Sequence, residues 1–299
     1  MADVHRFPIR LATLFLVGSW TWGTSWAASP PGDPSIHSDA WIPRSSIPVE
    51  IYRGFLVVAE GHFGGDAEGR NFVIDTGTSP SVLNIGVARG LGLPLSRARV
   101  SAVGGLSETF AATVPEIRFG PIRAISVPVL VSDLSRVERD LKLPIAGILG
   151  FDILGKSSFR LDYGRKLIEF GEVAPEGIPI ELSIRAGLPI AETKVGGKSL
   201  RLLVDSGTNR MVIFGARSAA ESSHNPAGSL TQETGVANLA ETRGVSLLEF
   251  ELSGVRFRQS AYIVSNGEEP LFDGLLGVRS LGVRALSLDA NRRILYLVK

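Results

Sequence analysis

Two carboxylates stand at matched places in this chain, each after an apolar run and before a glycine. Asp75 lies in residues 72–78, which read FVIDTGT, and Asp205 lies in residues 202–208, which read LLVDSGT, 130 positions later. Two carboxylates about 3 Å apart cannot both ionise, so they share a proton and one pKa rises. Such a pair can accept a proton from water and donate another to a carbonyl oxygen. The spacing therefore predicts paired acid–base chemistry, provided that the two halves of the chain face each other.

The residues after each aspartate suit that role. A glycine lets the backbone turn close beside the carboxylate. The first hydroxyl can reach across to lock the two loops together, and the second can hydrogen-bond the acid, although turn capping is the simpler use of these residue types. One copy alone is equally typical of an ordinary turn after a strand. The predicted support residues are Thr76, Gly77, Thr78, Ser206, Gly207 and Thr208.

The repeat extends well beyond the two motifs, and fixed-period similarity indicates a duplicated fold. Four blocks recur in one order, with offsets of 131, 130, 127 and 127 positions. Besides the motifs, the matched segments are 47–50 with 178–181, 147–150 with 274–277, and 161–168 with 288–295. Four blocks at nearly one spacing favour two equivalent halves that bring Asp75 and Asp205 together.

Both halves are predicted to be mainly β. The apolar runs into the two aspartates are continuous, as in strands buried on both faces, and 34 glycines suit many tight turns. Short helices are expected at 86–93 and 216–222. The four histidines are scattered without metal-ligand spacing, so we expect no metal site.

With these motifs and blocks, residues 47–299 resemble the aspartic peptidases of the pepsin and retropepsin group. The resemblance implies an all-β fold of two pseudo-symmetric β-barrel lobes with a cleft between them. It implies that Asp75 and Asp205 are catalytic, that no cofactor is used, and that the substrate is a peptide or protein. Residues 148–150 and 275–277 match the family's hydrophobic-hydrophobic-Gly element beneath the catalytic loop. The flap positions that the resemblance implies are Val103, Gly104, Gly105, Leu106, Thr234, Gly235 and Val236.

The chain also departs from the pepsin pattern. No tyrosine falls between Tyr52 and Tyr163, where pepsin-like enzymes carry a flap tyrosine, and there is no cysteine. Asn209 stands where the family usually has Ser or Thr. The halves are short for pepsin lobes, so the chain looks more like two fused retropepsin-type units, with a flap on each lobe.

Two other functions stay open. A peptide-binding protein of the same fold would keep the cleft without hydrolysis. An NTPase is suggested by residues 150–157, GFDILGKS, which satisfy the phosphate-binding pattern G-x-x-x-x-G-K-[ST]. That loop must open a helix, however, and a strand pattern follows Ser157, so nucleotide binding is disfavoured.

The N-terminus predicts export. Arg6 and Arg10 precede an apolar stretch that is short for a membrane span, and Ser25 and Ala27 suit a signal peptidase. We expect a signal peptide at 1–27, a flexible lead-in at 28–46, and lobes at 47–175 and 176–299. The product would be periplasmic or secreted, without stable membrane insertion after signal cleavage, and a monomer with an internal pseudo-two-fold. Beyond residue 27, acidic and basic residues number 29 each, which argues against a nucleic-acid partner.

Overall fold

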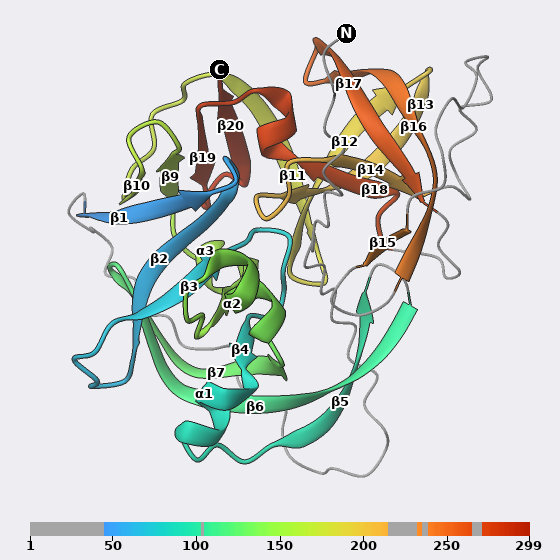
Figure 1. The fold of residues 1–299 in the computed structure, drawn as a ribbon. Coiled ribbons are helices and arrows are strands. Elements are labelled where there is room, and N and C mark those ends of the chain that lie inside the picture. Colours follow the sequence, from blue (N-terminus) through green and yellow to red (C-terminus); the bar gives the residue numbers. More distant parts are fainter. Residues whose placement is uncertain (1–44, 103–104, 215–231, 235–238, 265–270) are drawn as a thin grey trace, which may run out of the picture.

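The computed structural model describes residues 45–102, 105–214, 232–234, 239–264 and 271–299 (Figure 1). The predicted signal peptide, nearly all of the lead-in and the helix expected at 216–222 lie outside these residues. So do Val103, Gly104, Gly235 and Val236. No helix in the described part of the chain has the length and apolar character needed to cross a membrane.

The all-β class is confirmed. Over the described residues the strands join into one hydrogen-bonded sheet rather than two separate barrels. The first half contains β1 (Ser45–Tyr52), β2 (Leu56–Phe63), β3 (Arg70–Ile74), β4 (Val82–Asn84), α1 (Ile85–Gly90), β5 (Ser96–Ala102), β6 (Gly105–Phe119), β7 (Ile122–Ser132), α2 (Ser135–Leu141), β8 (Gly147–Leu149), α3 (Phe151–Leu154), β9 (Phe159–Asp162) and β10 (Leu167–Phe170). The second contains β11 (Ile178–Arg185), β12 (Leu188–Val195), β13 (Lys198–Asp205), β14 (Met211–Phe214), β15 (Gln232–Thr234), β16 (Leu239–Leu252), β17 (Val255–Val264), β18 (Gly274–Gly277), the 3-10 helix η1 (Val278–Leu281), β19 (Ala285–Asp289) and β20 (Ile294–Val298).

The two halves repeat one strand plan. In each, the strand before the aspartate pairs in parallel with the strand of the hydrophobic-hydrophobic-Gly element, β3 with β8 and β13 with β18. The strand after the aspartate then pairs antiparallel with that same element, β4 with β8 and β14 with β18. The strands that lead to the aspartates are buried on both faces, with Phe72, Val73 and Ile74 each at most 4% exposed, which explains their continuous apolar runs. The helix predicted at 86–93 exists as α1 and ends at Gly90, whereas α2 was not predicted.

One antiparallel sheet joins the halves. Its strands follow the order β1, β10, β9, β19, β20, β11, and its centre is the pairing of β9 with β19. In that pair Phe159 faces Leu288 and Leu161 faces Leu286. The predicted lobe boundary at 175/176 lies in the connection between β10 and β11, two strands of this shared sheet. The division into lobes at this point stays a prediction.

The closing hairpins confirm the duplication in detail. Arg165 donates its backbone N–H to Asp162 at 2.8 Å, and Arg292 does the same to Asp289 at 3.0 Å. The leading strands correct the sequence alignment, however. Val49 donates to the carbonyl of Lys166 as Leu182 donates to that of Arg293. Leu182 lies 133 positions after Val49, so the segments 47–50 and 178–181, matched at 131, are out of register by two residues.

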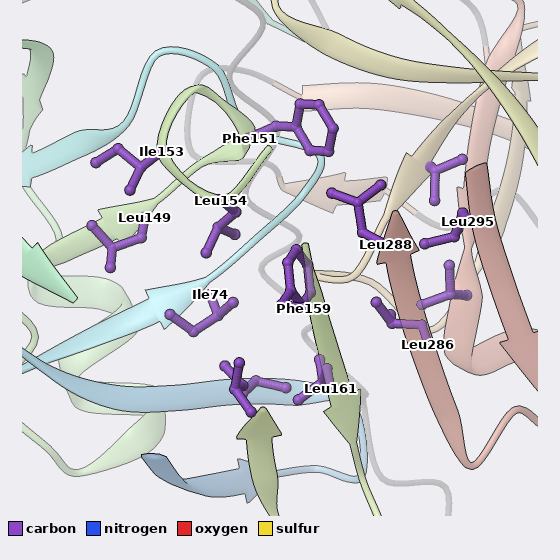
Figure 2. Packing of buried hydrophobic residues seen from close by; sticks show 14 of the residues in the cluster. Ile74, Leu149, Phe151, Ile153, Leu154, Phe159, Leu161, Leu286, Leu288 and Leu295 are labelled. Carbon is purple, nitrogen blue, oxygen red and sulfur yellow. The ribbon is translucent and has the colours of Figure 1, made fainter. Parts of the chain in front are cut away.

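The apolar core is continuous across the shared sheet. Figure 2 shows Phe151 and Phe159 from the first half directed toward Leu286 and Leu288 from the second. Phe159 and Leu286 are each only 1% exposed. Burying such side chains favours folding by about 1.5–3 kcal/mol each, so these apolar contacts stabilise the association of the two halves.

Candidate active site

The two strand plans deliver Asp75 and Asp205 to equivalent positions. Asp75 directly follows β3, and its backbone N–H donates to Leu149 on β8 at 3.0 Å. Asp205 ends β13 and lies opposite Gly277 of β18. Each carboxyl therefore lies at the end of a buried strand. The parallel neighbour of that strand is the hydrophobic-hydrophobic-Gly element of the same half.

The structure brings the two carboxyls together. A Cβ atom built on Gly77 would lie 2.6 Å from Cγ of Asp205, and one built on Gly207 would lie 2.7 Å from Cγ of Asp75. Each glycine therefore lies against the opposite carboxyl. Both aspartates are nearly covered, with 2% of Asp75 and 1% of Asp205 exposed. The predicted meeting of the two acids across the pseudo-dyad is confirmed.

Reciprocal hydrogen bonds lock the two loops, as predicted. The backbone N–H of Thr76 donates to the Ser206 hydroxyl, and the backbone N–H of Ser206 donates to the Thr76 hydroxyl, both at 3.0 Å. The Thr76 hydroxyl also donates to the carbonyl of Val204 at 2.9 Å. The Ser206 hydroxyl donates to the carbonyl of Ile74 at 3.4 Å. Every contact of this group crosses from one half to the other.

The hydrogen bonds within each loop are not equal. Asp75 accepts from the backbone N–H of Gly77 and from the Thr78 hydroxyl, both at 2.8 Å. Asp205 accepts from the backbone N–H of Gly207 at 2.7 Å. The expected bond from the Thr208 hydroxyl to Asp205 is absent among the described residues. That hydroxyl accepts from the backbone N–H of Arg210 instead, at 3.2 Å. Oδ2 of Asp205 is buried and receives no N–H or O–H from the described residues.

These surroundings affect the pKa values of the two carboxyls differently. Burial raises the pKa of Asp75, but the hydrogen bonds from Thr78 and Gly77 stabilise its ionised form and oppose that rise. Burial raises the pKa of Asp205 well above its ordinary value, and the negative charge of Asp75 acts in the same direction. The pair is one titrating unit. Within that unit, hydrogen bonds from Gly77 and Thr78 stabilise the ionised form of Asp75, whereas Asp205 receives one from Gly207.

The hydrophobic-hydrophobic-Gly elements pack beneath the loops, as predicted. A Cβ on Gly150 would lie 2.3 Å from the carbonyl oxygen of Thr78, and one on Gly277 would lie 2.8 Å from that of Thr208. Only glycine permits this approach. The first half adds a polar link that the sequence interpretation missed. The Ser81 hydroxyl donates to Asp152 at 2.8 Å and accepts from the backbone N–H of Gly150 at 2.9 Å.

The predicted flaps fall on hairpins. Gly105 and Leu106 begin β6, which pairs antiparallel with β5. The cross-strand pairs run from Ala102 with Gly105 to Ser96 with Ala111. Thr234 ends β15, which pairs with β16. Val103, Gly104, Gly235 and Val236 lie outside the described residues. A substrate cleft stays a prediction, and two cavities are defined in the described part of the chain. One is a small void lined by Thr76, Phe151 and Leu288 among others, and the other is near His62 and Arg118.

The phosphate-loop pattern lacks its required context. Helix α3 spans Phe151–Leu154, so Lys156 and Ser157 follow its C-terminal end instead of opening a helix. The chain then enters β9. In a phosphate-binding loop, the free N–H groups of a helix N-terminus hold the phosphates. No helix begins at Lys156 or Ser157, so the structure disfavours the NTPase interpretation. The described residues also hold no group of three or more His, Cys, Asp or Glu arranged for a metal ion.

Comparison with protein families agrees with this geometry. The family model described as aspartyl protease matches residues 59–153 and 191–279. The chain belongs to the aspartyl protease family. The two matched segments carry one Asp-Gly motif each and both hydrophobic-hydrophobic-Gly elements, so this family's unit occurs twice in one chain. A comparison with curated proteins found no match. Family membership supports protease activity, and the resemblance to a two-lobed aspartic peptidase is confirmed.

Proposed function

We propose that this aspartyl protease is an aspartic-type endopeptidase that cleaves peptide bonds with a water molecule activated by Asp75 and Asp205. The observation that carries the proposal is the contact of two buried carboxyls, each against the other loop's glycine. A second observation is the unequal hydrogen bonding, which favours one ionised and one protonated acid.

The proposed reaction assigns a role to each aspartate. Asp75, ionised, accepts a proton from the attacking water, while Asp205, protonated, gives its proton to the scissile carbonyl oxygen. The water oxygen bonds to the carbonyl carbon and a tetrahedral diol forms. Asp75 then returns its proton to the leaving nitrogen, and Asp205 takes one from a diol hydroxyl as the C–N bond breaks. Both acids recover their initial states without a covalent intermediate or a cofactor.

The hairpins of the two halves supply the rest of the proposal. Residues 103–106 and 234–236, which the resemblance assigns to the flaps, would close over an extended peptide, exclude water and offer backbone hydrogen bonds in the manner of an added strand. Two shared-proton carboxyls also predict a bell-shaped pH profile on the acidic side, because one acid must be ionised and the other protonated.

Location and assembly are proposed on the sequence. The N-terminal pattern supports export to the periplasm or the exterior, with cleavage after residue 27. The internal pseudo-two-fold already pairs both aspartates within one chain, which supports a monomer acting on peptide or protein substrates and not on nucleic acid. N-terminal sequencing of the mature protein and its mass in solution test these points.

The decisive experiment is peptide cleavage by the full chain across pH 3–8, against Asp75→Asn and Asp205→Asn. Each substitution preserves size and removes the ionisable group. We expect turnover in the wild type and its loss in both variants, with folding verified by thermal melting. Binding of peptides without turnover in the wild type would overturn the peptidase proposal in favour of a peptide-binding protein.

A further inference from the structure

Tyr163 is a buried tyrosine at the end of the shared sheet's strand β9. It is 6% exposed, and its backbone N–H donates to the carbonyl of Arg284 at 3.0 Å. Its hydroxyl is buried, and in the described part of the chain no group hydrogen-bonds to it. Since no hydroxyl partner fixes the ring there, the contacts made by the ring faces determine its role.

Arg279 covers that ring and links the two halves. Its guanidinium carbon lies 4.4 Å from the centre of the Tyr163 ring, within cation–π range. Its Nε donates at 2.9 Å to the carbonyl of Gly54, in the β1–β2 turn of the first half. Its Nη1 donates to the carbonyl of Val283. One side chain from the second half therefore holds a turn and an aromatic ring of the first.

The place of Arg279 in the second half ties this contact to the active site. Arg279 comes two residues after Gly277, which pairs directly with Asp205 across β13 and β18. Arg279 therefore connects the first half, through η1 and β18, to the strand end that carries Asp205.

The duplication does not copy this contact. The residue two positions after Gly150 is Asp152, which accepts a hydrogen bond from Ser81, whereas the residue two positions after Gly277 is Arg279. The counterpart of Tyr163 in the second half is Ala290, 127 positions later. One flank of the dyad therefore carries a cation on an aromatic ring, and the other carries a partly buried acid.

The charges around this contact favour an electrostatic role as well. Burial raises the pKa of Tyr163, Arg279 lowers it, and the charges of Asp205 and Asp75 raise it, so the phenol lies within electrostatic range of both acids.

Charged groups on neighbouring elements have contacts of their own. Arg53, next to Gly54, lies 3.9 Å from a carboxylate oxygen of Asp140. Arg210 lies over the Tyr262 ring, and Arg284 contacts Lys299 and Glu176. Asp162 accepts from the backbone of Arg165. Asp152 is held by Ser81.

We propose that Arg279, Tyr163 and Gly54 form an interlobe clasp in which Arg279 is a positioning residue for the peptidase reaction. It fixes the Asp205 side of the dyad against the first half and keeps a positive charge on the Tyr163 ring. The Tyr163 ring is the platform for the guanidinium, and its hydroxyl takes no part. This inference rests on the proposed peptidase function.

The test is the pH dependence of kcat/KM for the full chain with Arg279→Gln and Arg279→Lys. Glutamine keeps a donor for Gly54 and loses the charge, so both limbs of the profile should move up by roughly half a pH unit or more, since a lost cation favours protonated acids. Lysine keeps the charge, so its profile should stay at the wild-type pH and recover part of the activity.

Two control variants complete the experiment. Arg284 lies in the same half as Arg279, and its Nε also donates to a backbone carbonyl at 2.9 Å. Arg284→Gln removes this guanidinium and should leave the pH profile in place. Tyr163→Phe keeps the ring and should leave the profile and the melting temperature near those of the wild type.

The outcomes are distinct. An Arg279→Gln profile that superimposes on the wild type would overturn the clasp, even if the variant melts at a lower temperature. So would equal shifts in Arg279→Gln and Arg284→Gln, or loss of turnover in Tyr163→Phe. A wild type with no turnover at any pH would instead contradict the proposed function itself.

Discussion

The hydroxyls of Thr76 and Ser206 each accept the backbone N–H of the other residue at 3.0 Å. This reciprocal pair lies at the floor of the site, with 5% of Thr76 and none of Ser206 exposed. It connects the two loops at the residue directly after each aspartate, so it fixes the separation of the carboxyls. Its geometry makes the first prediction specific.

Thr76→Val should weaken the join between the halves. Valine has nearly the shape of threonine but leaves the N–H of Ser206 and the carbonyl of Val204 without their partner. An orphaned buried polar group costs roughly 1–3 kcal/mol, so the urea midpoint should fall by a corresponding amount. Thr76→Ser keeps the hydroxyl and serves as the matched control. Equal midpoints for the valine variant and the wild type would contradict the lock.

Gly77→Ala should disable the site by pushing the acids apart. The new Cβ would lie 2.6 Å from Cγ of Asp205, closer than carbon atoms pack. Overpacking of this kind costs about 1–3 kcal/mol, and we expect loss of peptide cleavage together with a lower melting temperature. Gly65→Ala is the control, since its Cβ would meet no atom within 4 Å. Retained cleavage in Gly77→Ala would show that the loops separate more easily than this packing allows.

Thr78→Val and Thr208→Val should differ although both threonines are fully buried. The Thr78 hydroxyl donates to ionised Asp75, so its removal raises the pKa of Asp75 further and moves the acid limb of activity to higher pH. The Thr208 hydroxyl accepts from Arg210 and makes no bond to Asp205, so Thr208→Val should leave the limb in place. Measured kcat/KM across pH decides between this asymmetry and a symmetric dyad. In a symmetric dyad, both variants would move the acid limb to higher pH.

The dyad should also make the folded state less stable as pH rises. Both aspartates have pKa values raised above the ordinary 3.8, so the folded state binds protons more tightly than the unfolded state. Stability from these groups is therefore present below about pH 4 and is lost as pH rises through the folded pKa values. The double variant Asp75→Asn with Asp205→Asn should melt higher than the wild type at neutral pH and show a flatter dependence. Parallel curves for the two proteins would refute the raised pKa values.

The sequence by itself determined the class of fold and the two acids. Continuous apolar runs ending at Asp75 and Asp205 specify buried strands followed by turns, because strand formation and glycine turns depend on local residue types. The repeated blocks then require a shared plan for both halves. The hydroxyls of Thr76 and Ser206 were predictable for the same reason, since they occupy equal places in that plan.

Only the tertiary structure decided how the two halves differ. Thr78 and Thr208 are identical in sequence context, yet one hydroxyl reaches its acid and the other faces Arg210. The two-residue shift of β1 against β11 and the contact of Arg279 with Tyr163 were likewise invisible in the motifs. Burial, hydrogen-bond partners and interlobe contacts arise from residues distant in the chain. Packing therefore makes the surroundings of the two carboxyls unequal, whereas local sequence patterns identify only the two aspartates.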